Sequence, residues 1–491
     1  MSAAGPPQGA NWFPSGGRGQ SVAATVRKRG GTTMNIAVAS PTGGTTIVID
    51  VAAFVRTLSF DVLPAEVVGQ GKRCVLDLIG VAAGGSRMPA ASIANTYAAT
   101  QMTSRDAEAR LLFDGRRASR AGAAFAGAST IDALDAHDGH VLTKGHAGVA
   151  ALPALLAAID GGAECGGAEF LTCLVLGYEI GTRAGIALHA STADYHCSGA
   201  WNALACAAIV GRLLHVDGAR LREAIGIAEY IGPCGQILRV CSHPTMLKDG
   251  SSWGAHAGVT AALLARDGFT GAPALTVEDD DVRSLWSDLG TRWRIREQYF
   301  KAYPVCRWAQ PAIEAALGVQ REHGFAADEI AHINIDTFSE AVALGSGRVV
   351  PETTDDAQYS LPYPVAAALV FGRLGGDEIV QTALADPRVR RLLDVMTLTE
   401  DREFSRRFPS ARFACVEITL KNGRTFRSQP AEARGDPGNP LSDEELREKY
   451  FALASPVLGH VRAERIERVV NALPDNSALS TLLEDLLHPA T

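Results

Sequence analysis

The feature that most constrains the fold is a helical pattern that runs almost without interruption from Ile49 to about Gly268. Apolar residues recur there at spacings of three and four, and Gly or Pro closes each segment. One segment, Ala200 to Leu214, is apolar nearly all round, so it must be covered on every side at the centre of a bundle. The pattern predicts helices at 50–58, 64–83, 90–101, 119–134, 148–159, 168–188, 199–214, 219–231 and 253–267.

The pattern changes at about Lys301, where strands begin to alternate with helices. Ala331 to Phe338 alternates as a half-buried strand does, and Phe413 to Leu420 alternates again before Asn422-Gly423, the pair that favours a tight hairpin. The hairpin returns through Thr425 to Gln429. Helices are predicted at 311–321 and 358–372 around the first strand, and at 442–454, 461–472 and 477–487 after the hairpin.

These patterns predict a mostly α protein in which a large helical domain is interrupted by a smaller α+β domain. Residues 1–46 are rich in Gly, Ser, Pro and Thr and carry only basic charges, which is typical of a disordered extension. The expected boundaries are 47–300 for the first part of the helical domain, 301–437 for the α+β domain and 438–491 for the returning helices.

Composition excludes several classes of partner. The net charge of −8 and the pI near 5.9 argue against nucleic acid or an anionic membrane surface as the partner. No uninterrupted apolar run of membrane-spanning length is present, so no transmembrane helix is expected. The nine cysteines are scattered without a Cys-x-x-Cys pair, which favours reduced thiols in a cytoplasmic protein and argues against an iron-sulfur or zinc site.

One loop concentrates the chemistry-bearing residues. Asp132 to His146 holds three acids, three histidines and a lysine, and an apolar helix follows at once. Charge packed this densely against a core is costly unless something binds it. The alternative is a solvated loop in which Asp135 or Asp138 caps a helix.

Three further polar stretches precede apolar helices: Tyr195 to Ser198, Arg239 to His256 with Lys248, and Gln358 to Tyr363. A histidine at a helix start can serve an anion site, since free amides and the helix dipole favour negative charge there. Each stretch also has a structural alternative to a functional role. In that alternative His196 or Ser198 serves only as a helix cap, Lys248 is only a solvated side chain, and the tyrosine at the helix start serves only in packing.

A match to the nucleophile elbow of serine hydrolases, Gly-x-Ser-x-Gly, occurs at 250–254 with Ser252 as the serine. That motif works only between a hydrophobic strand and a helix. Residues 242–249 do not form such a strand pattern, so a serine hydrolase is disfavoured.

Taken together, these stretches resemble the MmgE/PrpD family over nearly everything after residue 48. The family includes 2-methylcitrate dehydratase, cis-aconitate decarboxylase and iminodisuccinate epimerase. The resemblance implies a helical domain with an α+β lid, a homodimer, and chemistry that needs no metal or organic cofactor. It is carried by Asp135-Ala-His-Asp-Gly-His140 with Gly145-His146, Tyr195-His196, Met246-Leu-Lys248, Trp253-Gly-Ala-His-Ala-Gly258, Phe269-Thr-Gly271, Tyr303-Pro304 and Tyr359-Ser-Leu-Pro-Tyr363.

The resemblance also implies site residues, and the chain departs from the decarboxylase pattern in places. The decarboxylases have Asp-Phe-Asp-Asp-Thr where this chain has Asp135-Ala-His-Asp-Gly139, so His137 replaces an acid, and Gln310 stands where they carry a histidine. These departures weigh against decarboxylation of cis-aconitate. The catalytic residues implied are Asp135, His146, His196, Lys248 and Tyr363, and the substrate-binding residues expected are His137, His140, Tyr195, Arg239 and Arg307.

The resemblance thus predicts a cofactor-independent lyase that moves a proton next to a carboxylate of a small di- or tricarboxylate. In it a lysine pairs with a substrate carboxylate, a histidine acts as base, and a lid tyrosine donates a proton. An epimerase or isomerase of a small dicarboxylate such as iminodisuccinate is the alternative. A non-catalytic carboxylate-binding homologue is a third hypothesis.

Overall fold

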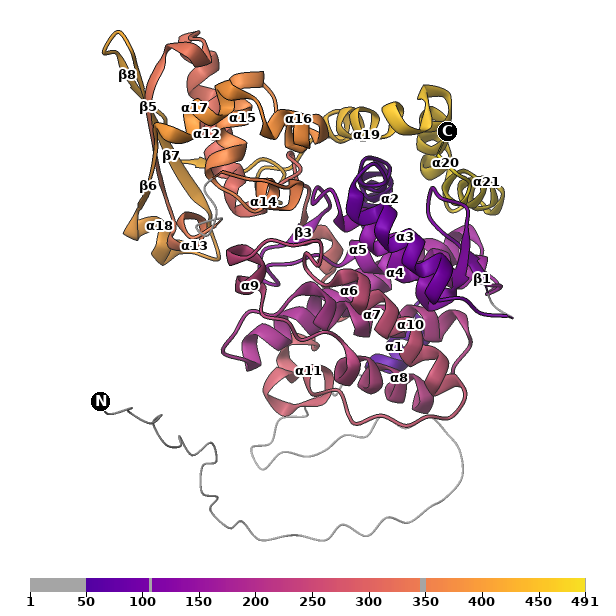
Figure 1. Cartoon of the computed structure of the whole chain (residues 1–491). Coiled ribbons are helices and arrows are strands. Elements are labelled where there is room, and N and C mark those ends of the chain that lie inside the picture. Colours follow the sequence, from indigo (N-terminus) through magenta and orange to yellow (C-terminus); the bar gives the residue numbers. More distant parts are fainter. Residues whose placement is uncertain (1–49, 106–107, 345–349, 491) are drawn as a thin grey trace, which may run out of the picture. The chain divides into compact units, whose positions relative to one another are not determined.

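Helix α7 (Ser198–Leu213) is the central element of the helical part (Figure 1). Every residue of it except Arg212 is buried, and it packs against α5, α6, α8 and α10. This is the position that its all-round apolar sequence predicts. The structure is a computed structural model that describes residues 50–105, 108–344 and 350–490, so the predicted disordered extension at 1–46 lies outside the described residues.

The other helices of this part agree with the sequence pattern. Every helix predicted between residues 50 and 267 is present with similar ends, and only the short α9 and α11 were not predicted. The helices are α1 (Val51–Thr57), α2 (Ala65–Gly85), α3 (Pro89–Gln101), α4 (Arg120–Asp132), α5 (Gly148–Asp160), α6 (Gly167–Ser191), α8 (Gly218–Ile231), α9 (Ile237–Ser242), α10 (Ser251–Arg266) and α11 (Leu275–Glu278).

Helix α6 is long and apolar enough to span a membrane by composition, but 89% of its most apolar window is buried within the protein. It packs against α7 and α5, as a core helix does. It is the one described helix that meets the length and composition test.

Glycines allow α10 to approach α7 closely. A Cβ added at Gly258 would lie 2.4 Å from the carbonyl oxygen of Ala203 and 2.4 Å from the Cβ of Cys206. Real Cβ atoms do not tolerate such contacts, so a larger residue would push the two helices apart.

We therefore expect Gly258→Ala to lower the free energy of unfolding by about 1–3 kcal/mol, because overpacking forces backbone shifts. Gly69→Ala on α2 is the matched control, since a Cβ there meets nothing within 4 Å. It should stabilise the protein by about 0.5–1 kcal/mol, the usual gain from replacing a helical glycine. Urea unfolding followed by circular dichroism measures both, and equal effects of the two changes would contradict the close-packing account.

The α+β part is built on one five-stranded sheet with the strand order β6-β5-β7-β8 and with β9 also paired to β7. β5 runs parallel to β6 and antiparallel to β7, with Ile335 opposite both Leu398 and Val416. Helix α12 packs against β7 and α17 against β5, so helices cover one face (Figure 1). The strands are β5 (Ile330–Thr337), β6 (Met396–Glu400), β7 (Phe413–Leu420), β8 (Thr425–Arg427) and β9 (Ala431–Glu432).

The predicted hairpin is confirmed, with Gly423 in the left-handed region at φ 85° between β7 and β8. The helix predicted at 358–372 begins too early: α14 ends at Gln358, and α15 begins only at Pro362 after a break at 359–361. Pro362 begins α15 instead of continuing α14, because proline has no backbone N–H to donate to the preceding turn. The helices here are α12 (Gln310–His323), α13 (Ser339–Val342), α14 (Thr354–Gln358), α15 (Pro362–Phe371), α16 (Gln381–Leu384), α17 (Pro387–Asp394) and α18 (Arg402–Arg407).

The last three helices return to the helical part. α19 (Asp443–Leu458) packs on α2, α20 (His460–Ala472) on α19 and α2, and α21 (Asn476–Leu487) on α20 and α6. Buried Tyr450 fills the space over Gly80 of α2, where a Cβ would lie 3.1 Å from its ring. The fold class predicted from sequence, a mostly α protein with a smaller α+β part, is therefore confirmed.

Two short antiparallel pairs were not predicted. β1 (Glu108–Arg110) pairs with β2 (Arg117–Ser119), and β3 (Gly139–His140) pairs with β4 (Gln298–Tyr299). The second pair ties the charged loop 132–146 to the segment that begins the α+β part. It therefore sets the position of Lys301, two residues after β4, relative to that loop.

Candidate active site

The loop between α4 and α5 is buried rather than solvated. Its three acids and three histidines all have less than a tenth of their surface exposed. Asp135 and Lys144 in this loop, and Lys248 before α10, have φ between 48° and 53°, which side-chain-bearing residues rarely adopt. Such strain persists only where the surroundings enforce it, and it is typical of functional sites.

A pocket opens beside this loop and draws residues from both parts of the chain. The loop gives Asp135, Lys144 and His146, and residues around α9 and α10 give Ile237, Cys241 and Asp249. β4, the segment that follows it and the α+β part complete the lining with Tyr299, Lys301, Cys306, Arg307, Trp308, Tyr359 and Arg412.

Lys301 and Asp135 form a buried ion pair at the centre of the lining. The Lys301 Nζ donates to Asp135 Oδ1 at 2.8 Å and to the Asp135 carbonyl at 2.9 Å. Burial lowers the pKa of Lys301, but the charge of Asp135 and the nearby Tyr299 and Cys306 outweigh it, so the pKa is raised. Lys301 is therefore a fixed cation and not a base at neutral pH.

His146 is held as a neutral imidazole with one nitrogen available. Burial, and then the charge of Lys301, lower the pKa of His146 well below its ordinary value. Its Nδ1 donates to the carbonyl of Asp138, and its backbone N–H donates to Ser198 Oγ at 3.0 Å. Because Nδ1 carries the proton, Nε2 keeps a lone pair and can accept a proton from a substrate.

Two cations in the lining have no carboxylate to neutralise them. Among the described residues neither Lys144 nor Arg412 forms an ion pair, and Nε and Nη1 of the buried Arg412 have no hydrogen-bond partner. Burial, and then Arg412, lower the pKa of Lys144 to about 8. Arg307 differs, since its Nη2 pairs with Asp436 at 2.9 Å. Lys144 and Arg412 are thus prepared to bind an anion that the protein does not supply.

Two lining groups are held in protonated form, and the pKa of a third is raised. Burial, and then Asp135, raise the pKa of Cys306 to about 12, while burial with Asp135 and Asp249 raises the pKa of Tyr359 well above 10. Burial raises the pKa of Asp249 to about 6, although Ser198 donates a hydrogen bond to it. Cys306 and Tyr359 can therefore give a proton to a substrate but cannot act as bases near pH 7.

Of the ten residues expected from sequence, Asp135, His146 and Arg307 line this pocket. Lys248 does not. Its Nζ pairs with Asp355 of α14 at 2.6 Å and donates to Gln358 Oε1, and its side chain is buried. Gln358 in turn donates to the carbonyls of Ala133 and Leu134. Lys248 thus holds α14 against the charged loop, and the lysines that line the pocket are Lys144 and Lys301.

Tyr363 also lies away from the pocket. It is on the first turn of α15 and its hydroxyl donates to the carbonyl of Glu378 at 2.7 Å. Tyr359, in the bend before α15, is the tyrosine that reaches the pocket. Gln310, in the position of the decarboxylase histidine, is buried and accepts a hydrogen bond from Arg307.

The segment Tyr195-His196 lies beside the pocket without lining it. His196 is half-buried, its backbone N–H donates to the ring of His189, and it bridges to Gln236. Tyr195 packs under Lys144, whose Nζ lies 3.9 Å from the centre of the ring. Arg239 is exposed on α9.

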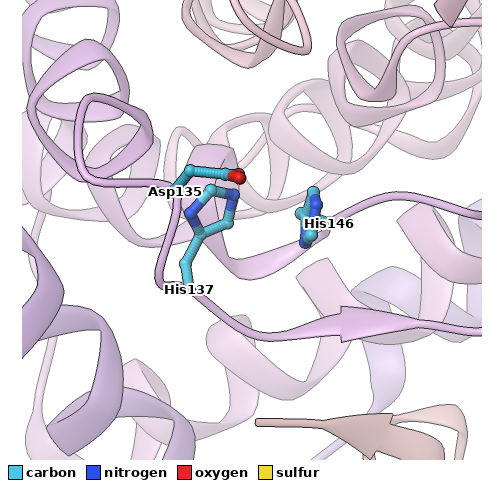
Figure 2. Close-up of side chains that lie close together, drawn as sticks. All are labelled: Asp135, His137 and His146. Atoms are coloured by element: carbon cyan, nitrogen blue, oxygen red, sulfur yellow. The ribbon is translucent and has the colours of Figure 1, made fainter. Parts of the chain in front are cut away.

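The two remaining histidines of the loop differ in their contacts. His140 is structural: its Nε2 lies 3.1 Å from Glu297 and its Nδ1 accepts from the backbone N–H of Leu142. His137 is fully buried behind His146, with a ring-centre distance of 4.3 Å, and neither ring nitrogen has a hydrogen-bond partner. Asp135, His137 and His146 bring potential metal ligands to within 4.8 Å of one another (Figure 2).

The serine-hydrolase motif has no supporting structure. Ser252 is the second residue of α10 and does not line the pocket, and the described residues before it form turns rather than a strand. The nucleophile elbow therefore lacks its strand, as the sequence suggested.

Sequence reasoning missed Lys301, Tyr359, Arg412, Lys144 and Asp249. Lys301 had a signal, because it is the one charge in the run Tyr299-Phe-Lys-Ala-Tyr-Pro-Val-Cys306. Tyr359 also had a signal in the sequence, because Pro362 and Pro364 follow it closely. Arg412 precedes β7 between Ala411 and Phe413, and nothing in its local sequence separates it from an exposed arginine at a strand start.

The chain is similar to known proteins over most of its length. It is 28% identical to "Cis-aconitate decarboxylase-like protein oryM" of Aspergillus oryzae, over 92% of this chain and 98% of that protein. It is 25% identical to human "Cis-aconitate decarboxylase", over 88% of this chain and 93% of that protein. It is 28% identical to "2-methylcitrate dehydratase, mitochondrial" of Yarrowia lipolytica, over 45% of this chain and 46% of that protein.

The family models agree with these similarities. The model described as the MmgE/PrpD N-terminal domain matches residues 49–285, and that of the MmgE/PrpD C-terminal domain matches residues 303–475. Together the two matches cover most of the chain and include nearly all of the pocket lining. The chain belongs to the MmgE/PrpD family and is a lyase of that family's type.

Proposed function

We propose that this protein is a lyase that acts on a small tricarboxylate by removing a proton from a carbon next to a carboxylate. The observation that carries this proposal is the pair of unneutralised cations, Lys144 and Arg412, beside the neutral base His146 and the fixed cation Lys301. Relatives named for cis-aconitate and 2-methylcitrate support a polycarboxylate substrate.

The proposed binding mode separates two carboxylates of the substrate. Arg412 and Lys144 bind the carboxylate that does not react, with charge-assisted hydrogen bonds. The reacting carboxylate lies toward Lys301, so that the negative charge that develops on it in the transition state meets a preorganised cation. The α+β part acts as a lid in this proposal, because it contributes Tyr359 and Arg412.

The proposed chemistry is a β-elimination of water. His146 Nε2 takes the proton from the carbon next to the carboxylate, and the electron pair of that C–H bond forms the new double bond. The C–O bond of the β-hydroxyl then breaks, and the leaving oxygen takes a proton from Tyr359 and departs as water. Asp135 keeps Lys301 in place through their ion pair. These steps use side chains of the chain alone and no cofactor.

An epimerase or isomerase of a dicarboxylate is the second candidate. Cys306 lines the pocket as a protonated thiol, so a second proton donor is present beside His146. Return of the proton to the opposite face of the same carbon would invert the centre without loss of water. The departures at 136–139 from the decarboxylase sequence also support a reaction other than decarboxylation.

Proton NMR of product mixtures distinguishes these outcomes. Purified enzyme is incubated with 2-methylcitrate, citrate, cis-aconitate, malate and iminodisuccinate in turn. We expect an unsaturated tricarboxylate from one of the hydroxy acids, or hydration in the reverse direction from the unsaturated acid. Inversion alone would establish the epimerase, and thermal stabilisation by a tricarboxylate without turnover of any of these acids would indicate a non-catalytic binding protein and contradict the proposal.

Tyr359→Phe and Tyr363→Phe separate the two lid tyrosines. Tyr359→Phe should lower kcat about 10²–10⁴-fold with little change in stability, because it removes the proton donor. Tyr363→Phe should lower the free energy of unfolding by about 0.5–1.5 kcal/mol, because it removes a buried hydrogen bond, and leave kcat unchanged. Steady-state kinetics and urea unfolding of both variants measure this, and the reverse pattern would assign the role to Tyr363.

The pH dependence of activity tests the proposed anion subsite, which consists of Lys144 and Arg412. Lys144 is charged below its pKa of about 8 and neutral above it, so kcat/KM should fall as pH rises through about 8. Arg412→Gln should raise KM and move this alkaline limb to higher pH, because the charge of Arg412 lowers the pKa of Lys144. An unchanged limb in Arg412→Gln would contradict the shared subsite. Arg239→Gln, on an exposed residue outside the lining, is the control.

The protein is also proposed to be a homodimer and to be located in the cytoplasm. A homodimer is supported by exposed apolar side chains such as Tyr230, Leu247 and Phe269, which a partner subunit would cover. Light scattering on a sizing column tests it, and a monomer mass would contradict it. A cytoplasmic location is supported by nine unpaired cysteines, since disulfides are rare in a reducing compartment.

A further inference from the structure

His137 raises a problem that the proposed lyase chemistry does not solve. Its side chain has no exposed surface, and both Nδ1 and Nε2 are without a hydrogen-bond partner. Burying polar nitrogens without partners is costly, so native proteins almost always satisfy them. The nearest carboxylate oxygen, Asp132 Oδ1, lies 3.6 Å from Nε2, beyond hydrogen-bond distance.

The neighbours of His137 are potential metal ligands of the right kind. Figure 2 shows the Asp135 carboxylate beside the His137 ring, with the His146 ring facing both. One ligand atom from each residue lies within 4.8 Å of the others, and all three residues are buried. Two imidazoles and one carboxylate form a ligand set that binds first-row divalent metals and leaves positions open.

The other contacts of Asp135 and His146 leave their ligand atoms free. Lys301 occupies Oδ1 of Asp135, and Oδ2 has no partner. Nδ1 of His146 donates to the Asp138 carbonyl, which leaves Nε2 for a metal. A backbone carbonyl that fixes the tautomer of a ligating histidine is the usual outer partner in metal sites.

Further buried carboxylates lie around the three ligands. Three buried carboxylates around the loop, Asp132, Asp138 and Asp249, have no ion pair with a lysine or arginine in the described part of the chain. The nearby buried lysines are already paired, Lys301 with Asp135 and Lys449 with Asp77.

We propose that Asp135, His137 and His146 bind a divalent transition metal such as Zn²⁺, and that this metal inhibits the enzyme by occupying the nitrogen that serves as base. Zinc bonds of about 2.0–2.1 Å hold ligand atoms closer together than 4.8 Å, so the three side chains draw together on binding. Inhibition follows because a metal on His146 Nε2 removes the lone pair that accepts the substrate proton. Binding goes beyond the proposed function, and only the inhibition rests on it.

Metal binding is tested first without substrate. The chelator-treated full-length protein is titrated with Zn²⁺ against a chromophoric chelator and with Co²⁺ by visible absorption. We expect one site per chain with a Co²⁺ spectrum that indicates nitrogen and oxygen ligands. Loss of a residue that only hydrogen-bonds to a metal ligand weakens metal binding about 10–100-fold. His137→Gln should weaken binding by more than this, because it removes a ligand itself.

His140→Gln is the matched control, since His140 lies in the same loop but both of its ring nitrogens are already bonded. It should leave metal affinity unchanged. If His137→Gln does not fold, His137→Asp keeps a ligand atom at this position and should bind the metal with altered affinity. No binding to the native protein, or equal affinity in native protein and folded His137→Gln, would overturn the site.

Inhibition is tested on the substrate found by NMR. Zn²⁺ should inhibit the native enzyme reversibly, with full recovery of activity on addition of chelator. When the activity of each protein is expressed relative to its own rate without metal, inhibition of His137→Gln should need a higher Zn²⁺ concentration. Binding without inhibition would overturn the inhibitory role. If no substrate is found, the proposed function fails while the binding experiment stands by its own result.

Discussion

Replacing Lys301 with Met should lower kcat about 10²–10³-fold, the usual loss when a preorganised group that stabilises transition-state charge is removed. The Nζ of Lys301 is the one amine in the pocket lining that is held by a buried ion pair, at 2.8 Å from Asp135. Without it, the charge on the reacting carboxylate would develop against an unpaired Asp135. Steady-state kinetics on the substrate identified by NMR measure the change.

The same substitution should also destabilise the protein by about 3–5 kcal/mol, because removal of one partner leaves the other charge buried and unpaired. Lys301→Met combined with Asp135→Asn removes both charges and should recover much of that stability but none of the activity. Recovery of activity in the double variant would show that Lys301 serves only to neutralise Asp135. A kcat near that of the native enzyme in Lys301→Met would remove Lys301 from the mechanism.

Replacing His146 with Gln should lower kcat about 10²–10⁴-fold, because it removes the general base. The sign of the pH effect follows from its lowered pKa. The imidazole accepts a proton only above its pKa, so activity of the native enzyme should persist below pH 6.5 and fall only when His146 becomes protonated. The residual activity of His146→Gln should lack this acid limb.

The control for His146→Gln is His140→Gln in the same loop, which should retain the acid limb and most of the activity. A native acid limb centred near pH 6.5, the ordinary histidine value, would contradict a base held neutral by burial and Lys301. Profiles of kcat/KM against pH for the three proteins decide between these outcomes.

The fold was predictable because periodicity encodes it directly. Ala200 to Leu214 could bury all of its faces only at the centre of a bundle, and α7 is there. Asn422-Gly423 formed the turn between β7 and β8, with Gly423 at positive φ. The helix predicted at 358–372 was wrong only at its start, because α15 begins at Pro362 and Tyr359 lies in the turn before it.

The site was less predictable because side-chain direction depends on tertiary contacts. The first loop was recognised from its density of charge, and it contributes Asp135 and His146 to the pocket. Lys248 and Tyr363 were implied as catalytic groups by the family resemblance, yet each has a partner from a distant element, Asp355 and Glu378. No local pattern reports such partners. Arg412 approaches the loop only through the fold of the α+β part.

The most direct test of the central claim is exchange of the substrate proton with deuterium. The native enzyme, Lys301→Met, His146→Gln and Arg239→Gln are incubated with substrate in deuterated water, and the carbon next to the carboxylate is followed by proton NMR. We predict exchange in the native enzyme and in Arg239→Gln, strong loss in Lys301→Met, and loss in His146→Gln. Exchange at native rate in both Lys301→Met and His146→Gln would contradict the assignment of this pocket as the active site.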